Sequence, residues 1–134
     1  MAGAEAPEQT MLDGPPRAGF SRLPATQKLE TLTKRADFLR AARGPRVVTP
    51  GFILQIRDRH DDAPPRVGFT CSKKVGNAVA RNRAKRRLRE IARLEMPGAA
   101  ALGHDYVLIG RAGETARRDF AVMRDELRKA LAHV

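Results

Sequence analysis

The stretch RVGFTCSKKVGNAVARNRAKRRLRE, residues 66–90, changes its hydrophobic period near its middle. In RVGFTCS (66–72) apolar side chains alternate with small or polar ones, which is typical of a half-buried strand. After the loop KKVGN, apolar side chains recur at helical spacing, and Asn77 is placed to cap the helix. The stretch therefore predicts a strand, a loop and a helix in succession, with the helix running to about Met96.

The predicted helix has one narrow apolar edge and one strongly cationic face. Its apolar side chains recur about one helical turn apart, at Ala80, Ala84, Leu88 and Ile91. The roughly opposite side carries Asn82, Lys85, Arg86, Arg89 and Arg93. Like charges one turn apart destabilise a helix, and only Glu90 offsets the six cations between residues 80 and 90. The cationic face therefore predicts a polyanionic partner rather than an ordinary solvated surface.

The charge of the whole chain supports the same partner. The formal net charge is +11 and the sequence pI is about 11.1. Nine Lys or Arg residues and one Glu lie between Lys73 and Arg93, so this segment carries most of the excess. Such a concentrated positive field predicts nucleic-acid binding. With no Trp and a single Tyr, recognition of backbone and shape is expected to dominate over base stacking.

The segments on either side of residues 66–90 complete a mixed pattern of helices and strands. The predicted elements are a helix at 33–43, strands at 46–48, 51–57, 66–72 and 105–111, and a final helix at 114–134. Their order is α-β-β-β-α-β-α. The charged, proline-containing segment RDRHDDAPPR suits an exposed hairpin connection between the second and third strands.

Alternation along the strands predicts two different faces of the sheet. Phe52, Leu54 and Ile56 share one face, which is expected to belong to the core. The opposite face carries small and polar residues, Gln55 and Thr70 among them, and is expected to stay open to a ligand.

Length and composition predict one small globular domain. The chain has 134 residues, of which 42% are hydrophobic. Residues 1–25 are rich in Ala, Gly and Pro and predict a disordered tail before a folded domain at 26–134. Cys71 is the only cysteine, and no apolar run reaches the roughly 18 residues of a membrane helix. We expect a cytoplasmic protein with no membrane partner.

The sequence offers no catalytic or metal-binding set of its own. His60, His104 and His133 lie far apart without Cys or acidic partners at metal spacing, so they are expected at the surface. The two common nucleotide-binding loop patterns, GxxxxGK[ST] and GxGxxG, are both absent from the sequence. Lys73 and Lys74 precede the N-terminus of the cationic helix, a favourable place for an anion. We therefore predict no catalytic residue, no metal ligand and no protein-bound cofactor.

The order RVG, SKK, GNAV, RNR and KRRLRE within residues 66–90 resembles the protein component of bacterial ribonuclease P. Weaker similarity extends over about residues 23–131. The resemblance implies a single compact α/β domain, an α+β sandwich-like arrangement with a left-handed βαβ crossover. It also implies a subunit of a ribonucleoprotein that removes the 5′ leader from precursor tRNA. In that particle the RNA subunit performs the hydrolysis with Mg²⁺, and the protein binds the RNA subunit and the leader.

By position, the resemblance assigns two sets of RNA-binding residues. The basic set comprises Lys73, Lys74, Arg81, Asn82, Arg83, Lys85, Arg86 and Arg89, which match the family's motifs, and Arg93, which adjoins them on the cationic face. The leader cleft comprises Phe38, Ala42, Gln55, Thr70 and Ser72. Phe38 also suits a core position. The family commonly has aromatic residues where this chain has Ala42 and Gln55, so base stacking on the leader is expected to be weaker here.

Two other functions fit parts of the sequence. A basic ribosomal or chromosome-associated protein would share the composition but not the ordered series of motifs. An enzyme that hydrolyses RNA with its own side chains would need an acid–base set, which the sequence does not show.

Overall fold

A computed structural model describes residues 22–24, 27 and 29–132. Its elements are β1 (Glu30–Thr31), α1 (Arg35–Ala42), β2 (Arg46–Val48), β3 (Phe52–Asp58), β4 (Arg66–Cys71), the 3₁₀ turn η1 (Lys73–Val75), α2 (Ala78–Glu95), β5 (His104–Gly110) and α3 (Phe120–Ala132). All seven predicted helices and strands are present in the predicted order. The sequence analysis missed β1, which is only two residues long, and the turn η1.

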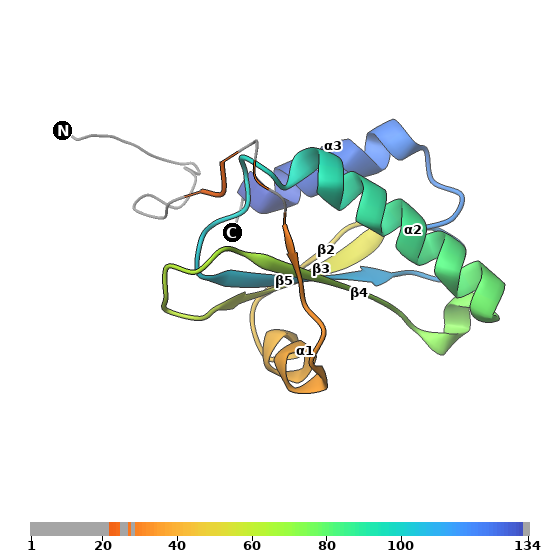
Figure 1. Ribbon diagram of the computed structural model, residues 1–134. Coiled ribbons are helices and arrows are strands. Elements are labelled where there is room, and N and C mark those ends of the chain that lie inside the picture. Colours follow the sequence, from red (N-terminus) through yellow and green to blue (C-terminus); the bar gives the residue numbers. More distant parts are fainter. Residues whose placement is uncertain (1–21, 25–26, 28, 133–134) are drawn as a thin grey trace.

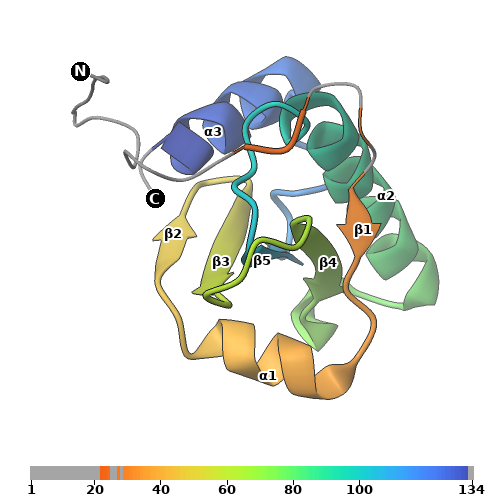
Figure 2. The ribbon, with the colours of Figure 1, turned by 60° about the vertical axis from the view of Figure 1, so that its left-hand side comes forward.

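The strands form one five-stranded sheet in the order β1-β4-β5-β3-β2, with helices on both faces. Figures 1 and 2 show α2 and α3 on one face and α1 on the other. β4 and β5 are parallel neighbours joined through α2. With β1 nearest the viewer and α2 above the sheet in Figure 1, this β4–α2–β5 crossover is left-handed, against the usual rule. The α/β architecture and the unusual crossover implied by the family resemblance are both present.

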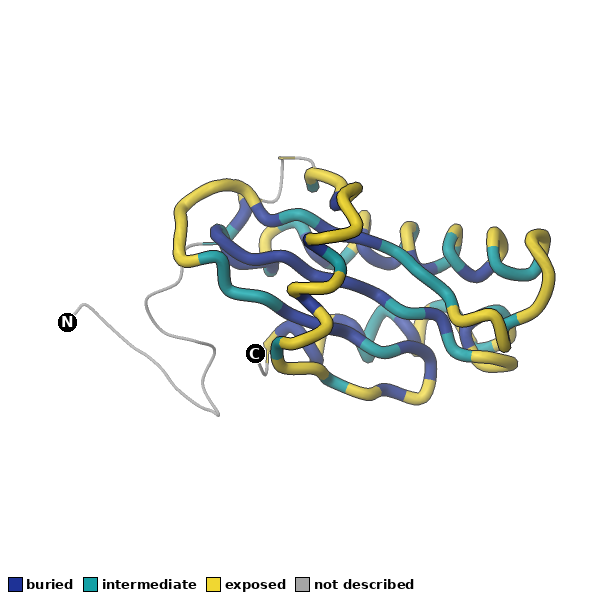
Figure 3. The backbone as a smooth tube through the Cα atoms, turned by 90° about the horizontal axis from the view of Figure 1, so that it is seen from below, coloured by how far each residue is buried: buried dark blue, intermediate teal, exposed yellow. Residues whose placement is uncertain are grey.

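The predicted hairpin between the second and third strands is wrong. β3 and β4 are not neighbours, because β5 lies between them and pairs with both. The connecting segment is exposed, as expected, from His60 to Pro64. Figure 3 views this side of the molecule and shows the exposed connection beside the buried central strands. Sequence proximity suggested the pairing, but the insertion of β5 comes from tertiary packing that local pattern does not encode.

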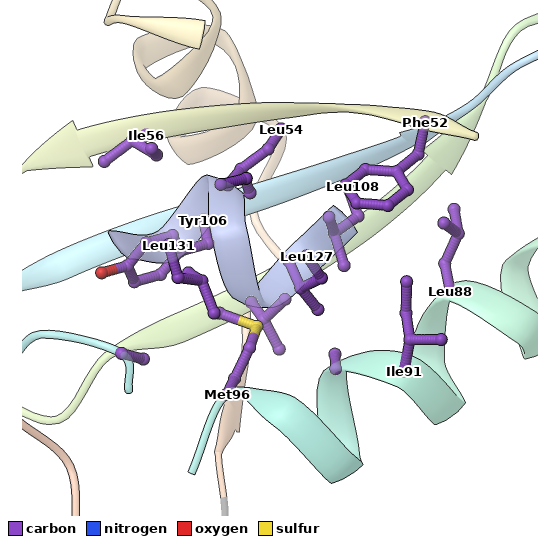
Figure 4. Packing of buried hydrophobic residues seen from close by; sticks show 14 of the residues in the cluster. Phe52, Leu54, Ile56, Leu88, Ile91, Met96, Tyr106, Leu108, Leu127 and Leu131 are labelled. Carbon is purple, nitrogen blue, oxygen red and sulfur yellow. The ribbon is translucent and has the colours of Figure 1, made fainter. Parts of the chain in front are cut away.

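The main core lies between the sheet and the pair α2 and α3. Phe52, Leu54 and Ile56 point into it and are almost fully buried, as the alternation predicted. Figure 4 shows Leu88 and Ile91 of α2 facing these strand residues. Burying each large side chain stabilises the fold by roughly 1.5–3 kcal/mol, so this layer fixes the orientation of α2.

The other face of the sheet is less open than predicted, because α1 packs on part of it. Ala41 of α1 and Val107 of β5 are buried together with Leu32 in a second, smaller core. The Phe38 ring lies on Gly68, where an added Cβ would be 2.5 Å from the ring. Gly68 therefore allows α1 to approach the sheet closely.

Two residues that were predicted to lie outside the core are buried. Leu23 is 1% exposed, and its N–H donates to the carbonyl of Ala100, so the folded part starts before the predicted boundary at residue 26. The rest of the predicted tail lies mostly outside the described residues. His104 is also buried, and its Nδ1 lies 2.9 Å from the carbonyl oxygen of Leu102. His60 is exposed as expected, and His133 lies outside the described residues.

Candidate nucleic-acid interface

The packing of α2 determines which of its side chains face solvent. Asn77 caps the helix, its side-chain oxygen accepting from the N–H of Ala80 at 3.0 Å. Ala84, Leu88 and Ile91 are fully buried, whereas Ala80, at the start of the predicted apolar edge, is only half-buried. The predicted edge therefore packs on the core over most of its length, and the basic residues project from the other sides.

Five cations of α2 have no acidic partner in the described part of the chain. From here on, the cationic face of α2 means these five residues, Arg81, Arg83, Lys85, Arg86 and Arg89. Compared with the face predicted from sequence, it adds Arg81 and Arg83 and leaves out Arg93. All five are exposed or half-buried, and the exposed amide of Asn82 lies among them. Several cations on one helix without neutralising acids repel one another, and a polyanion would relieve that repulsion.

Arg87 belongs to the same basic run but serves the fold. Its guanidinium donates to the carbonyls of Ala116 and Arg118, both at 2.7 Å, and lies 5.8 Å from the centroid of the Phe120 ring. It therefore fastens α2 to the segment before α3. Arg93 also differs from the cationic face, because it pairs with Glu90 one turn earlier.

Lys73 and Lys74 extend the positive surface at the N-terminal end of α2. Both are exposed on η1, directly before the capped start of the helix. Free N–H groups and the helix dipole favour an anion at such a position.

A cleft of about 430 Å³, here called the α1 cleft, lies between α1 and the sheet. Phe38, Ala42, Gln55 and Thr70 line it, so four of the five predicted cleft residues come together. Ser72 does not line the cleft; it is exposed at the end of β4. Phe38 is half-buried on Gly68 and also borders the cleft, so its position is compatible with both the core and the cleft interpretation.

The amide of Gln55 is the least expected feature of the α1 cleft. The residue is only 8% exposed, and its side chain has no hydrogen-bond partner among the described residues. A buried amide without a partner costs free energy, roughly 1–3 kcal/mol. A ligand in the cleft could satisfy it with one donor and one acceptor.

The sequence analysis missed a buried ion-pair network on the same side of the sheet. It consists of Asp37, Asp105, Arg57, Arg59 and Arg66. Arg66 donates to both carboxylate oxygens of Asp105 at 2.8 Å, which raises the pKa of the guanidinium. The strand register provides a signal, because Arg57, Asp105 and Arg66 are direct neighbours across three strands. That signal appears only once β5 is placed between β3 and β4.

The described residues form neither a metal-ion site nor a membrane-spanning helix. No three His, Cys, Asp or Glu side chains in this part of the chain gather to form a metal-ion site. Among the described helices, none combines the length and the apolar character needed to cross a membrane.

The chain has close sequence relatives among known proteins. The sequence profile of the family described as Ribonuclease P matches residues 26–134. A protein of Ruegeria pomeroyi named ribonuclease P protein component is 55% identical over 109 residues, covering 80% of this chain and 87% of that protein. The protein of the same name from Caulobacter vibrioides is 52% identical over 113 residues, covering 84% and 75%.

Solved structures agree with the sequence relatives. The ribonuclease P protein of Thermotoga maritima is 32% identical with a TM-score of 0.66, and the match covers 78% of this chain and 97% of that one. The Staphylococcus aureus ribonuclease P protein is 29% identical with a TM-score of 0.60, covering 78% and 94%.

Proposed function

The chain belongs to the ribonuclease P protein family, and from this premise we propose that its α2 helix binds the ribonuclease P RNA while its α1 cleft binds the 5′ leader of precursor tRNA. As a family member, the chain is the RNA-binding protein component of a ribonucleoprotein endoribonuclease that matures tRNA. The RNA subunit performs phosphodiester hydrolysis in this enzyme. The comparisons favour this function over that of a ribosomal or chromosome-associated protein.

The unpaired cations of α2 are the observation that carries the RNA-subunit proposal. Arg81, Arg83 and Arg86 present planar guanidinium groups, which grip phosphate through two hydrogen bonds. Asn82 adds a donor and an acceptor for a base edge or a 2′-hydroxyl. Because the face is a rigid, capped helix held by the core, its charges are positioned before the RNA arrives. Lys73 and Lys74 would extend the contact to phosphates at the helix N-terminus.

The α1 cleft suits a single strand better than a duplex. It combines one aromatic side chain, Phe38, with the hydroxyl of Thr70 and the unpartnered amide of Gln55. A base in the cleft would stack on Phe38 and pair its polar edge with Gln55. Since Ala42 offers no second stacking surface, we expect charge and hydrogen bonding to contribute more than stacking to leader affinity. Ser72 lies outside the cleft. Because it directly precedes Lys73 in the sequence, we expect it to contact the backbone of the same single-stranded leader.

Mg²⁺, cofactor and location complete the proposal. We propose that the holoenzyme requires Mg²⁺, that this chain carries no cofactor of its own and that it works in the cytoplasm. Titrating precursor cleavage with Mg²⁺, with and without the chain, checks the first two points. Cell fractionation checks the third.

The proposal is tested by recovering and sequencing the RNA that co-purifies with the chain at moderate salt. We expect one abundant RNA that, reconstituted with the chain, cleaves precursor tRNA at the end of its leader. Recovery of ribosomal RNA alone, or of no RNA, would contradict the proposal. The chain without RNA is expected to leave precursor tRNA intact, and specific cleavage by the RNA-free chain would show that protein side chains do the chemistry.

A further inference from the structure

A second hollow lies on the α2 side of β4, and it is larger than the α1 cleft. Its volume is about 650 Å³, against about 430 Å³ for the cleft. Thr31 lines it from β1, Phe69 from β4, and Lys85 and Arg89 from α2. Figure 2 shows β1 standing beside α2 at this edge of the sheet. We call this hollow the α2 groove.

The lining of the α2 groove has the chemistry of a nucleotide site. Its floor is apolar, formed chiefly by Leu32, Val67, Phe69 and Ala92. Its rim is cationic, and no Asp or Glu of the described residues lines it. Pockets of this size with an apolar floor and a few polar groups suit a ligand with one flat apolar part and one charged part. A nucleotide has both, in its base and its phosphate.

Arg89 and Phe69 form a composite surface inside the groove. The Arg89 guanidinium lies 5.5 Å from the centroid of the Phe69 ring. Unpaired bases in RNA–protein complexes stack on aromatic rings and on guanidinium planes. Lys85, which has no acidic partner in the described part of the chain, lines the groove one helical turn before Arg89 and can pair with a phosphate.

The two hollows share part of their lining at the edge of the sheet. Phe38 and Phe69 each border both of them. β1 forms the sheet edge here and pairs with β4 over only two residues, so it presents a short barrier. The shared lining places the two hollows next to each other at this edge, so a single strand in the α1 cleft has a short way to the α2 groove.

We propose that the α2 groove is a second leader-binding site, which takes a nucleotide of the precursor's 5′ leader beyond those in the α1 cleft. The base stacks on the Phe69–Arg89 surface, and its phosphate pairs with Lys85. This inference rests on the proposed function, because it extends the leader's path from the α1 cleft. Leaders long enough to reach the groove then bind more tightly than shorter leaders.

The test measures precursor affinity of the reconstituted holoenzyme while the leader is lengthened one nucleotide at a time. In the unmodified enzyme we expect affinity to rise in two steps, first as the α1 cleft fills and then as the groove fills. Thr31→Glu places a carboxylate on the groove's rim at an exposed residue, so the fold should be retained. The variant should keep the first step and lose the second, a loss of about 5- to 150-fold in affinity for long leaders, the range for one stacked base.

Val122→Glu is the matched control, because it adds the same charge at an exposed position on α3, outside the groove. It should keep both steps. A single step in the unmodified enzyme, or a second step that survives Thr31→Glu, would overturn the inference. If Thr31→Glu weakens binding of the RNA subunit itself, the groove holds a nucleotide of that RNA and the leader assignment is wrong. Absence of the first step would instead refute the proposed leader cleft.

A fluorescence measurement checks the location independently. The chain contains no tryptophan, so Thr31→Trp places a single reporter in the groove. Its emission should change only with leaders that reach the second step, whereas Val122→Trp on α3 should not respond. A Thr31→Trp holoenzyme that is silent to all leaders while binding them normally would contradict the inference.

Discussion

Two arginine-rich regions of this molecule differ in how their charge is balanced. In the buried ion-pair network, Arg57, Arg59 and Arg66 surround the carboxylate of Asp105, which is completely buried. On the cationic face of α2, five Lys and Arg side chains have no acidic partner in the described part of the chain. Charge balanced inside the fold holds strands together, and charge left unbalanced at the surface is available to RNA.

Both kinds of arginine occur within residues 66–90, which also carry the family resemblance. Arg66, at the start of the stretch, pairs with Asp105. Arg87, inside the basic run, binds backbone carbonyls before α3. Arg83 and Arg86, between them in sequence, are exposed and unpaired. A sequence motif can thus combine residues kept for folding with residues kept for a partner.

The largest stability effect is expected at the centre of the ion-pair network. Asp105→Asn keeps the shape of the side chain but removes the charge that balances three guanidinium groups. Leaving buried charge unpaired should lower the free energy of unfolding by about 3–5 kcal/mol, measured by urea denaturation. Asp125→Asn on α3 is the control, since the Asp125 side chain is 40% exposed and its partners Arg128 and Lys129 are exposed. Equal decreases in the two variants would remove the distinction between the network and an ordinary surface pair.

A comparable decrease is expected on the apolar edge of α2. Leu88 is fully buried in the main core, so Leu88→Ala should destabilise the fold by roughly 2–5 kcal/mol. RNA affinity of the protein that remains folded should change little, because Leu88 faces away from the cationic face. If Leu88→Ala abolished RNA binding without lowering the free energy of unfolding, the two faces of α2 would be assigned backwards.

Local features of the site were predictable from the sequence, and nonlocal ones were not. The strand, the cap at Asn77 and the buried edge at Leu88 follow from spacing within a few residues, and the structure confirms them. The placement of β5 between β3 and β4 depends on contacts between distant segments. For that reason the partners of Asp105 and the burial of His104 could not be predicted from local pattern.

The α1 cleft shows the same limit at the level of single residues. Alternation placed Gln55 and Thr70 on one sheet face, and both line the cleft. Neither alternation nor composition predicts that α1 would cover that face closely enough to bury Gln55. The α2 groove was not predicted at all, because its rim includes β1, which is too short to show a pattern.

Two adjacent arginines on α2, Arg86 and Arg87, should differ in their effect on stability, although the difference is smaller than those above. Arg87→Ala removes the donor to the carbonyls of Ala116 and Arg118, so stability should fall by roughly 1–3 kcal/mol. Arg86→Ala should leave stability unchanged or slightly higher, because it relieves repulsion between like charges. Thermal and urea unfolding of the two variants measure this difference. Identical stability of the two variants would mean that the hydrogen bonds of Arg87 to the carbonyls contribute nothing to the fold.

The smallest effect on RNA affinity is expected on α3, whose cations are paired with acidic side chains. Arg124 contacts Glu95 at 2.6 Å, and Arg128 contacts both Glu95 and Asp125. Arg124→Ala combined with Arg128→Ala removes the same charge as two substitutions on α2. RNA affinity and its salt dependence should stay close to those of the unmodified protein. A large decrease in RNA affinity would show that total charge, rather than its unpaired part, governs binding.

The most direct test of the central claim is the salt dependence of binding to the RNA subunit. We would compare Arg83→Ala combined with Arg86→Ala, which border neither hollow, with the paired double variant on α3. On α2, the slope of log affinity against log salt should decrease by about 0.9 for each duplex phosphate that the variant no longer neutralises, or about 0.7 on single strands. The α3 variant should keep the unmodified slope. An unchanged slope for the α2 variant, or an equal decrease for both, would contradict the account.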